Sequence, residues 1–157
     1  MIPLNKQVNN FITNYQAGQS VEYVNANNYL KLFTFEMGSE WKTSCVLFYY
    51  SDTQSPNFSG ICNIGFRKGS STSNLEIVGF KTLNFLGNLA TKLFAVVTGT
   101  NKAEVYVKAQ ANESPTLNII NISKHNSSDY YGKLTIDCVT VVSSLPSGTQ
   151  KTPTSLL

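Results

Sequence analysis

The residue types most often used in catalysis gather in one short segment, residues 124–131. The single histidine, His125, is followed by Ser127, Ser128 and Asp129, the types that supply the nucleophile, base and carboxylate of many hydrolases. Neighbours on one loop rarely reach the geometry that such a set requires, because its members must converge from different directions. We therefore expect no catalytic site in this segment, and no catalytic residue is predicted elsewhere.

The same segment is the best candidate for a ligand-binding surface. Aromatic rings stack on the faces of sugars, while amide and carboxylate groups bond to sugar hydroxyls. Tyr130 and Tyr131 supply the rings, and Asn126 and Asp129 supply the polar groups. The single tryptophan, Trp41, opens an apolar run and is expected to cap the core instead.

Carboxylates offer a second chemistry, because sugar hydrolysis needs only two acids at a fixed separation. The glutamates considered for such a pair are Glu36, Glu40, Glu76 and Glu104. Sequence spacing cannot reveal that separation, so the four are interpreted as surface charges, and an enzyme is kept as an alternative. The three aspartates stand too far apart for a calcium loop, and no metal or cofactor is predicted.

Hydrogen bonding rather than charge dominates the surface chemistry of this chain. Asn, Ser and Thr make 49 of the 157 residues and only 13% are charged, whereas an average protein is about a quarter charged. The net charge is +3, but the basic residues stand isolated along the chain. No stripe that follows phosphates is therefore expected, and nucleic acid is not a predicted partner.

The cysteines and the N-terminus bear on the cellular compartment. Cys45, Cys62 and Cys138 lie in apolar or β-branched runs. Their odd number and spacing fit neither a disulfide framework nor a zinc site, so all three are predicted to be reduced core residues. No stretch approaches the ~20 apolar residues of a membrane helix, and the first residues lack the pattern of a secretory signal. Assembly in a reducing cytoplasm, without membrane insertion, is expected.

Residues 1–20 are predicted to form a separate N-terminal helix or stalk. Leu4, Val8, Phe11 and Tyr15 follow a spacing that places them on one stripe of a helix. The asparagines between them are poor helix formers, so the stripe needs a partner surface. That surface is either the chain's own domain or the same stripe in other copies. We predict the second arrangement, in which the four residues form the seam of a trimer.

Residues 21–142 show the short apolar runs and polar turns of an all-β domain. The turns are rich in Gly, Asn and Ser, which favour changes of chain direction. The runs predicted as strands are 30–36, 44–51, 60–66, 74–80, 92–98, 103–109, 116–123 and 132–142. A double-sheet jelly roll has about this number of strands. The predicted fold class is therefore all-β, a jelly-roll-like antiparallel β-sandwich.

Three segments carry more specific expectations. Residues 103–109 place Glu104, Tyr106 and Lys108 between apolar residues, which predicts one buried and one solvated face. Residues 46–50 are apolar throughout, which predicts a strand covered on both faces, by the second sheet on one side and by a neighbouring element or subunit on the other. Residues 143–157 have no core of their own. They are predicted to be an extended tail that lies across another surface, which would hint at assembly.

Five short motifs, taken in order, give the chain a resemblance to a known family. They are Trp41–Phe48, Gly65–Arg67, Leu75–Ile77, Phe94–Val96 and the acidic, apolar, Tyr, apolar, Lys run of Ala103–Lys108. Their order over residues 41–142 resembles that in the β-sandwich domains at the tips of bacteriophage tail fibres, baseplates and neck appendages. The resemblance spans about two-thirds of the chain.

Such domains are typically trimers on virions that bind host-surface carbohydrate or anchor other virion parts. The resemblance implies a virion structural protein, assembled in the cytoplasm of a host bacterium, that acts in host attachment or virion assembly. Its expected partners are further copies of itself, other virion proteins and host cell-wall carbohydrate. The alternatives are a capsid or neck decoration protein without glycan binding, and a carbohydrate-active enzyme module.

Overall fold

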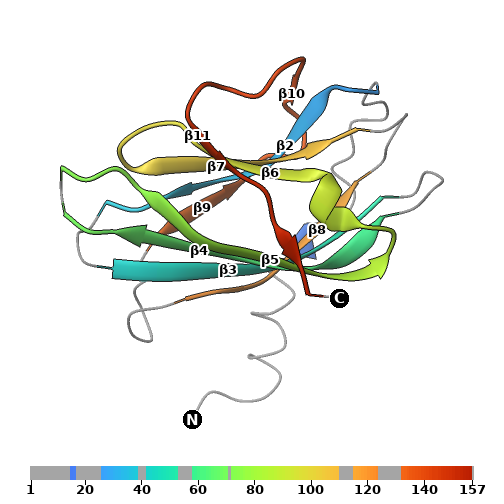
Figure 1. Ribbon diagram of the computed structural model, residues 1–157, viewed down its shortest axis with the longest axis horizontal. Coiled ribbons are helices and arrows are strands. Elements are labelled where there is room, and N and C mark those ends of the chain that lie inside the picture. The colour runs from blue at the N-terminus through green and yellow to red at the C-terminus, as the bar shows by residue number, and fades with distance from the viewer. Residues whose placement is uncertain are drawn as a thin grey trace, which may run out of the picture.

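Two β-sheets packed face to face make up the body of the protein in the computed structural model (Figure 1). The structure describes residues 15–16, 26–38, 42–52, 58–70, 72–109, 115–123 and 132–156. Each sheet has six strands. The all-β sandwich expected from the sequence is confirmed.

The first sheet has the strand order β1-β8-β3-β4-β5-β12. Its strands are β1 (Tyr15–Gln16), β3 (Lys42–Ser51), β4 (Ser59–Lys68), β5 (Glu76–Leu86), β8 (Thr116–Ile122) and β12 (Thr154–Ser155). Its neighbours are antiparallel except for β12, which runs parallel to β5.

The second sheet has the order β10-β2-β7-β6-β11, and β9 also pairs with β2. Its strands are β2 (Tyr29–Glu36), β6 (Leu93–Val97), β7 (Lys102–Lys108), β9 (Lys133–Ile136), β10 (Val141–Val142) and β11 (Thr149–Lys151). A single 3-10 turn, η1 (Leu89–Thr91), precedes β6.

The core lies between the sheets and is rich in aromatic rings. Phe33 of the second sheet meets Phe48 of the first edge to face, with ring centroids 5.3 Å apart. Phe35 and Phe66 stack at 4.4 Å. All four side chains are fully buried, and each contributes roughly 1.5–3 kcal/mol through burial alone. This layer of rings packs the two sheets against each other.

Two buried lysines close the opposite ends of the sandwich. Lys68, 1% exposed, reaches from the first sheet to the Thr100 carbonyl oxygen at 3.4 Å and to the side-chain oxygen of Asn101. At the other end Lys92 lies 3.7 Å from a carboxylate oxygen of Asp52. A buried ammonium must find such partners, because desolvation without them is costly.

Each expected run up to residue 123 overlaps a strand, although β5 extends six residues beyond the expected 74–80. The expected last strand, 132–142, is wrong as a single element. It is split into β9 and β10. The carboxylate of Asp137 accepts hydrogen bonds from the amides of Val139 and Thr140, at 2.9 and 2.6 Å. These bonds make a local turn, in which Cys138 adopts a left-handed φ of 58°. An aspartate that bonds to amides two and three positions on competes with the strand ladder.

The N-terminal helix prediction fails at the one position where the structure describes the stripe. Tyr15 lies in β1 and pairs with Asn118 of β8, so it extends the first sheet instead of ending a helix. Leu4, Val8 and Phe11 lie outside the described residues.

The C-terminal tail is ordered, but it lies across its own domain, which corrects the expectation of another surface. Residues 143–156, here called the strap, leave β10 at one edge of the second sheet, pass over that sheet and join both sheets at the other edge (Figure 1). Gly148 has a φ of +145°, and a Cβ there would lie 2.0 Å from the Val97 carbonyl oxygen. Only glycine fits this close approach.

Burial bears on two other expectations. Along β3, Val46, Phe48 and Tyr50 are buried, whereas Leu47 and Tyr49 are only half-buried. The described residues of this chain therefore cover the second face only in part, and its cover by another subunit stays a prediction. On β7, Glu104 and Tyr106 are 8% and 2% exposed, although a solvated face was expected. The strap crosses this face, with Gly148 packed on Val96, which explains why the face is dry. Cys62 and Cys138 are buried as expected, and Cys45 is half-buried.

Candidate functional site

A groove of about 1170 Å³ lies at the edge of the sandwich where the strap descends. We call it the edge groove. Three segments line it, the β4–β5 hairpin, the β6–β7 hairpin and the part of the strap that contains β11. The lining residues are Arg67, Asn74–Val78, Val97–Thr100 and Ser147–Lys151. It therefore lies between the edges of the two sheets, on the side where β11 and β12 appear in Figure 1.

Hydrogen bonds between the two hairpins hold one end of the edge groove. The amide of Leu75 donates to the Thr100 carbonyl oxygen at 2.8 Å, and Lys68 reaches the same oxygen from below. At the rim, Arg67 donates to one carboxylate oxygen of Glu76 through two nitrogens, at 2.6 and 3.1 Å. Both of these side chains are 57% exposed, so the pair is open to solvent.

A lysine of the strap spans the groove. Lys151 Nζ donates a hydrogen bond of 3.2 Å to the Ile77 carbonyl oxygen. That oxygen belongs to the outer edge of β5, and no strand pairs with residues 76–80 on that side within the described part of the chain. The β4–β5 pairing is irregular next to Val78, between the pairs Gly65–Gly79 and Phe66–Ile77. Irregularities of this kind are typical of sheet edges.

The lining of the edge groove favours binding over catalysis. Its described residues include no histidine, cysteine or aromatic ring, and the charged ones among them are Arg67, Glu76 and Lys151. The remaining polar groups are short hydroxyl and amide side chains and backbone atoms. Nucleophilic catalysis needs a nucleophile next to a base, and this lining offers none. In the described part of the chain, no three His, Cys, Asp or Glu side chains come together to hold a metal ion.

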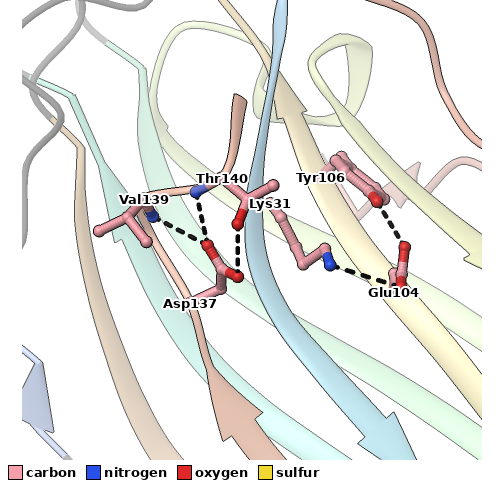
Figure 2. Close-up of polar contacts among 6 residues, drawn as sticks. All are labelled: Lys31, Glu104, Tyr106, Asp137, Val139 and Thr140. Carbon is pink, nitrogen blue, oxygen red and sulfur yellow. Dashed lines mark hydrogen bonds and ion pairs between the residues drawn. The ribbon is translucent and has the colours of Figure 1, made fainter. Parts of the chain in front are cut away.

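A second polar cluster lies on the outer face of the second sheet (Figure 2), the face that the strap crosses (Figure 1). Lys31 Nζ is 3.4 Å from a carboxylate oxygen of Glu104, and the hydroxyl of Tyr106 donates to the other oxygen. Burial, together with the hydrogen bond to Glu104 and its charge, raises the pKa of Tyr106. The phenol therefore stays neutral and acts as a hydrogen-bond donor.

The Asp137 turn borders this cluster (Figure 2). Partial burial alone would raise the pKa of Asp137, but hydrogen bonds from Val139 and Thr140 and the charge of Lys31 outweigh it and lower the pKa. Burial and the neighbouring Asp137 charge raise the pKa of Cys138 to about 12, so this thiol is unreactive at neutral pH. Neither Glu104 nor Tyr106 lines the edge groove, and the cluster is a structural one.

The residues predicted as a binding surface, Tyr130, Tyr131, Asn126 and Asp129, lie outside the described residues, as do His125 and Trp41. Of the glutamates considered for glycoside chemistry, Glu40 lies outside the described residues, and Glu36 and Glu104 stand on the neighbouring strands β2 and β7. Glu76 stands on the first sheet, Glu104 on the second, and Glu104 is engaged by Lys31 and Tyr106. Sequence reasoning missed the edge groove, because no motif joins its three segments.

No protein-family model, curated protein or solved structure matches this chain. Among the described residues, no helix has the length and apolar character needed to cross a membrane.

Proposed function

We propose that this chain is a structural protein of a bacteriophage virion, a tail-fibre, appendage or baseplate component whose β-sandwich acts in host-surface attachment or virion assembly. The observation that supports it best is the edge groove, a wide polar groove without a nucleophile and base. Such a lining suits recognition by hydrogen bonds. The uncharged, Asn-, Ser- and Thr-rich composition favours the same mode of binding.

Two measurements test this function together. Mass spectrometry of purified phage particles is expected to detect the chain, and the labelled protein is expected to decorate host cells if it acts in attachment. Detection in particles without cell binding would favour assembly or decoration. Absence from particles together with no cell binding would refute the proposal. If the chain is detected in particles, placing it in a cryo-EM map of the particle would distinguish a tail location from a head location.

The proposed trimer has its own test. Leu4, Val8 and Phe11 are proposed to pack about the trimer axis, where each buried Phe is worth roughly 1.5–3 kcal/mol. The Phe11→Asp protein is therefore expected to be a monomer by light scattering at micromolar concentration, while the parent protein is a trimer. A monomeric parent, or a Phe11→Asp protein that is still a trimer, would show that these residues are not the seam.

A further inference from the structure

Exposed apolar side chains concentrate along one edge of the first sheet. The large hydrophobic residues that are exposed within the described part are Val78, Phe85, Leu86, Val139 and Leu156. Three of these lie on β5, and Leu156 follows β12 and donates its amide to the Thr82 carbonyl oxygen of β5 at 2.9 Å. Phe85 and Leu86 lie at the far end of β5, beyond Lys81 and Thr82 where β12 pairs, so Val78 is the member of this set on residues 76–80.

The backbone along this edge is open over five residues. β12 pairs with β5 only at Lys81 and Thr82, which leaves residues 76–80 without a strand on their outer side in the described part of the chain. We call this stretch the free edge. Five extended residues span about 17 Å, and the edge groove runs along their first half. An open edge beside a groove is the arrangement by which proteins bind peptides through strand addition.

The Ile77 carbonyl oxygen of the free edge accepts a hydrogen bond from Lys151. A lysine ammonium occupies the place where a neighbouring strand would present an amide, 3.2 Å from the Ile77 oxygen. Lys151 is an exposed residue on a three-residue strand, so its side chain can move aside. Once displaced, the ammonium would face the incoming chain, where a carboxylate is its natural partner.

We propose that the free edge and the edge groove receive an extended segment of another virion protein, which adds to β5 as a strand and carries an acidic side chain toward Lys151. A polypeptide fits better than a glycan, because the described residues of the lining include no ring on which a sugar could stack. Arg67 and Lys151 outnumber Glu76 in the lining, which favours an acidic segment. Only the identity of the partner as a virion protein rests on the proposed function.

The test uses the full chain, labelled with ¹⁵N, and a blocked seven-residue peptide of alternating threonine and valine with a central aspartate. Amide NMR signals of residues 76–80 and 147–151 are expected to shift on titration. Peptides with N-methyl groups on either set of alternate amides serve as controls. One of the two sets is expected to abolish binding, because only one set of amides faces the free edge.

A charge exchange tests the role of Lys151. The Lys151→Glu protein is expected to bind the aspartate peptide at least tenfold more weakly, and to recover binding to the same peptide with lysine in place of aspartate. The matched control is Lys133→Glu, which changes an exposed lysine on β9, next to β2 and away from β11 in the second sheet, and is expected to leave both affinities unchanged. Circular dichroism of each variant confirms that the sandwich is folded.

Four results would overturn the proposal. The first two are the absence of any shift of the amide NMR signals up to about 1 mM peptide, and equal binding of both N-methylated peptides. The third is a set of shifts confined to residues outside 76–80 and 147–151. The fourth is a shift of the groove residues that a neutral glucan oligosaccharide causes and the peptide does not. A dimer that light scattering detects and that Val78→Lys dissociates would assign the free edge to a second copy instead. The detection of the chain in particles is independent of all these results, so the proposed function and this inference fail separately.

Discussion

The outer faces of the two sheets carry the same kind of ion pair in opposite surroundings. On the second sheet, Lys31 and Glu104 lie under the strap, with side chains 19% and 11% exposed. On the first sheet, Arg67 and Glu76 are each 57% exposed at the rim of the edge groove. The comparison shows that a covering segment, more than the pair itself, determines what the charges contribute to stability.

Burial beneath the strap changes how many polar partners a carboxylate needs. Glu104 is out of water and has two partners, the ammonium of Lys31 and the hydroxyl of Tyr106, because a buried carboxylate without partners is strongly destabilising. Glu76 can exchange Arg67 for water at little cost, since exposed pairs contribute about 0–1 kcal/mol. The covered pair therefore serves the fold, and the open pair is free to serve a ligand.

The largest expected effect is that of removing the covered carboxylate. Glu104→Ala leaves Lys31 and Tyr106 without their acceptor beneath the strap and opens a gap, so the free energy of unfolding should fall by about 3 kcal/mol. Urea denaturation followed by circular dichroism measures it. Glu104→Gln, which keeps an acceptor for Tyr106, should lose less. A loss in Glu104→Ala no larger than that in Glu76→Ala would contradict the comparison.

The second largest loss of stability is expected from displacing the strap. Gly148→Ala places a methyl group against the Val97 carbonyl oxygen at a left-handed φ, and should cost roughly 2 kcal/mol. The control is Gly99→Ala, where a Cβ meets nothing within 4 Å. If the strap is the cover, Glu104→Ala should cost less in the Gly148→Ala protein than in the parent. Strict additivity of the two changes would speak against this coupling.

A smaller and pH-dependent effect belongs to the Asp137 turn. Its lowered pKa means that the folded state favours the carboxylate, so its contribution is complete above the unfolded pKa of about 3.9 and disappears as the pH falls below it. Asp137→Asn should therefore lower stability by about 1 kcal/mol at pH 7. The difference from the parent should shrink toward zero near pH 2. Thermal unfolding across this range measures it, and a difference that stays constant would refute the assignment.

The smallest effect is expected at the open pair. Glu76→Ala removes an exposed partner of Arg67 and should change the free energy of unfolding by no more than about 0.5 kcal/mol. The change should also be insensitive to 1 M salt, because little Coulomb energy is present to be screened. A loss above about 1.5 kcal/mol would mean that the groove rim is part of the fold.

The sequence predicted the inward side of the sandwich well and its outer side poorly. Alternation in residues 103–109 correctly placed Ala103, Val105 and Val107 in the core. The same alternation cannot show whether Glu104 meets water or another segment. The cover comes from residues 143–148, whose polar composition does not show which surface they contact. Strand patterns report burial against the other sheet, and a strap leaves no such pattern.

The sequence contains a turn motif at the break in the last strand, but the apolar alternation around it favoured a continuous strand. Leu134, Ile136 and Cys138 alternate as in a strand, but Asp137 precedes Thr140 by three positions, a spacing typical of side-chain turns. The edge groove had no comparable signal. It is made of backbone edges and short polar side chains brought together by sheet pairing, so it could be found only after the strand order was known.

The path of the strap also has a consequence for the rate of folding. Its hydrogen bonds join residues far apart in the chain, 71 positions between Asn84 and Ser155 and 74 between Ile77 and Lys151. Contacts at such separations form slowly, because the entropy of closing a long loop must be overcome first. Until they form, the outer face of the second sheet is wet and the edges of β5 and β6 are open. The chain is then most exposed to aggregation, and this period ends only when the strap docks.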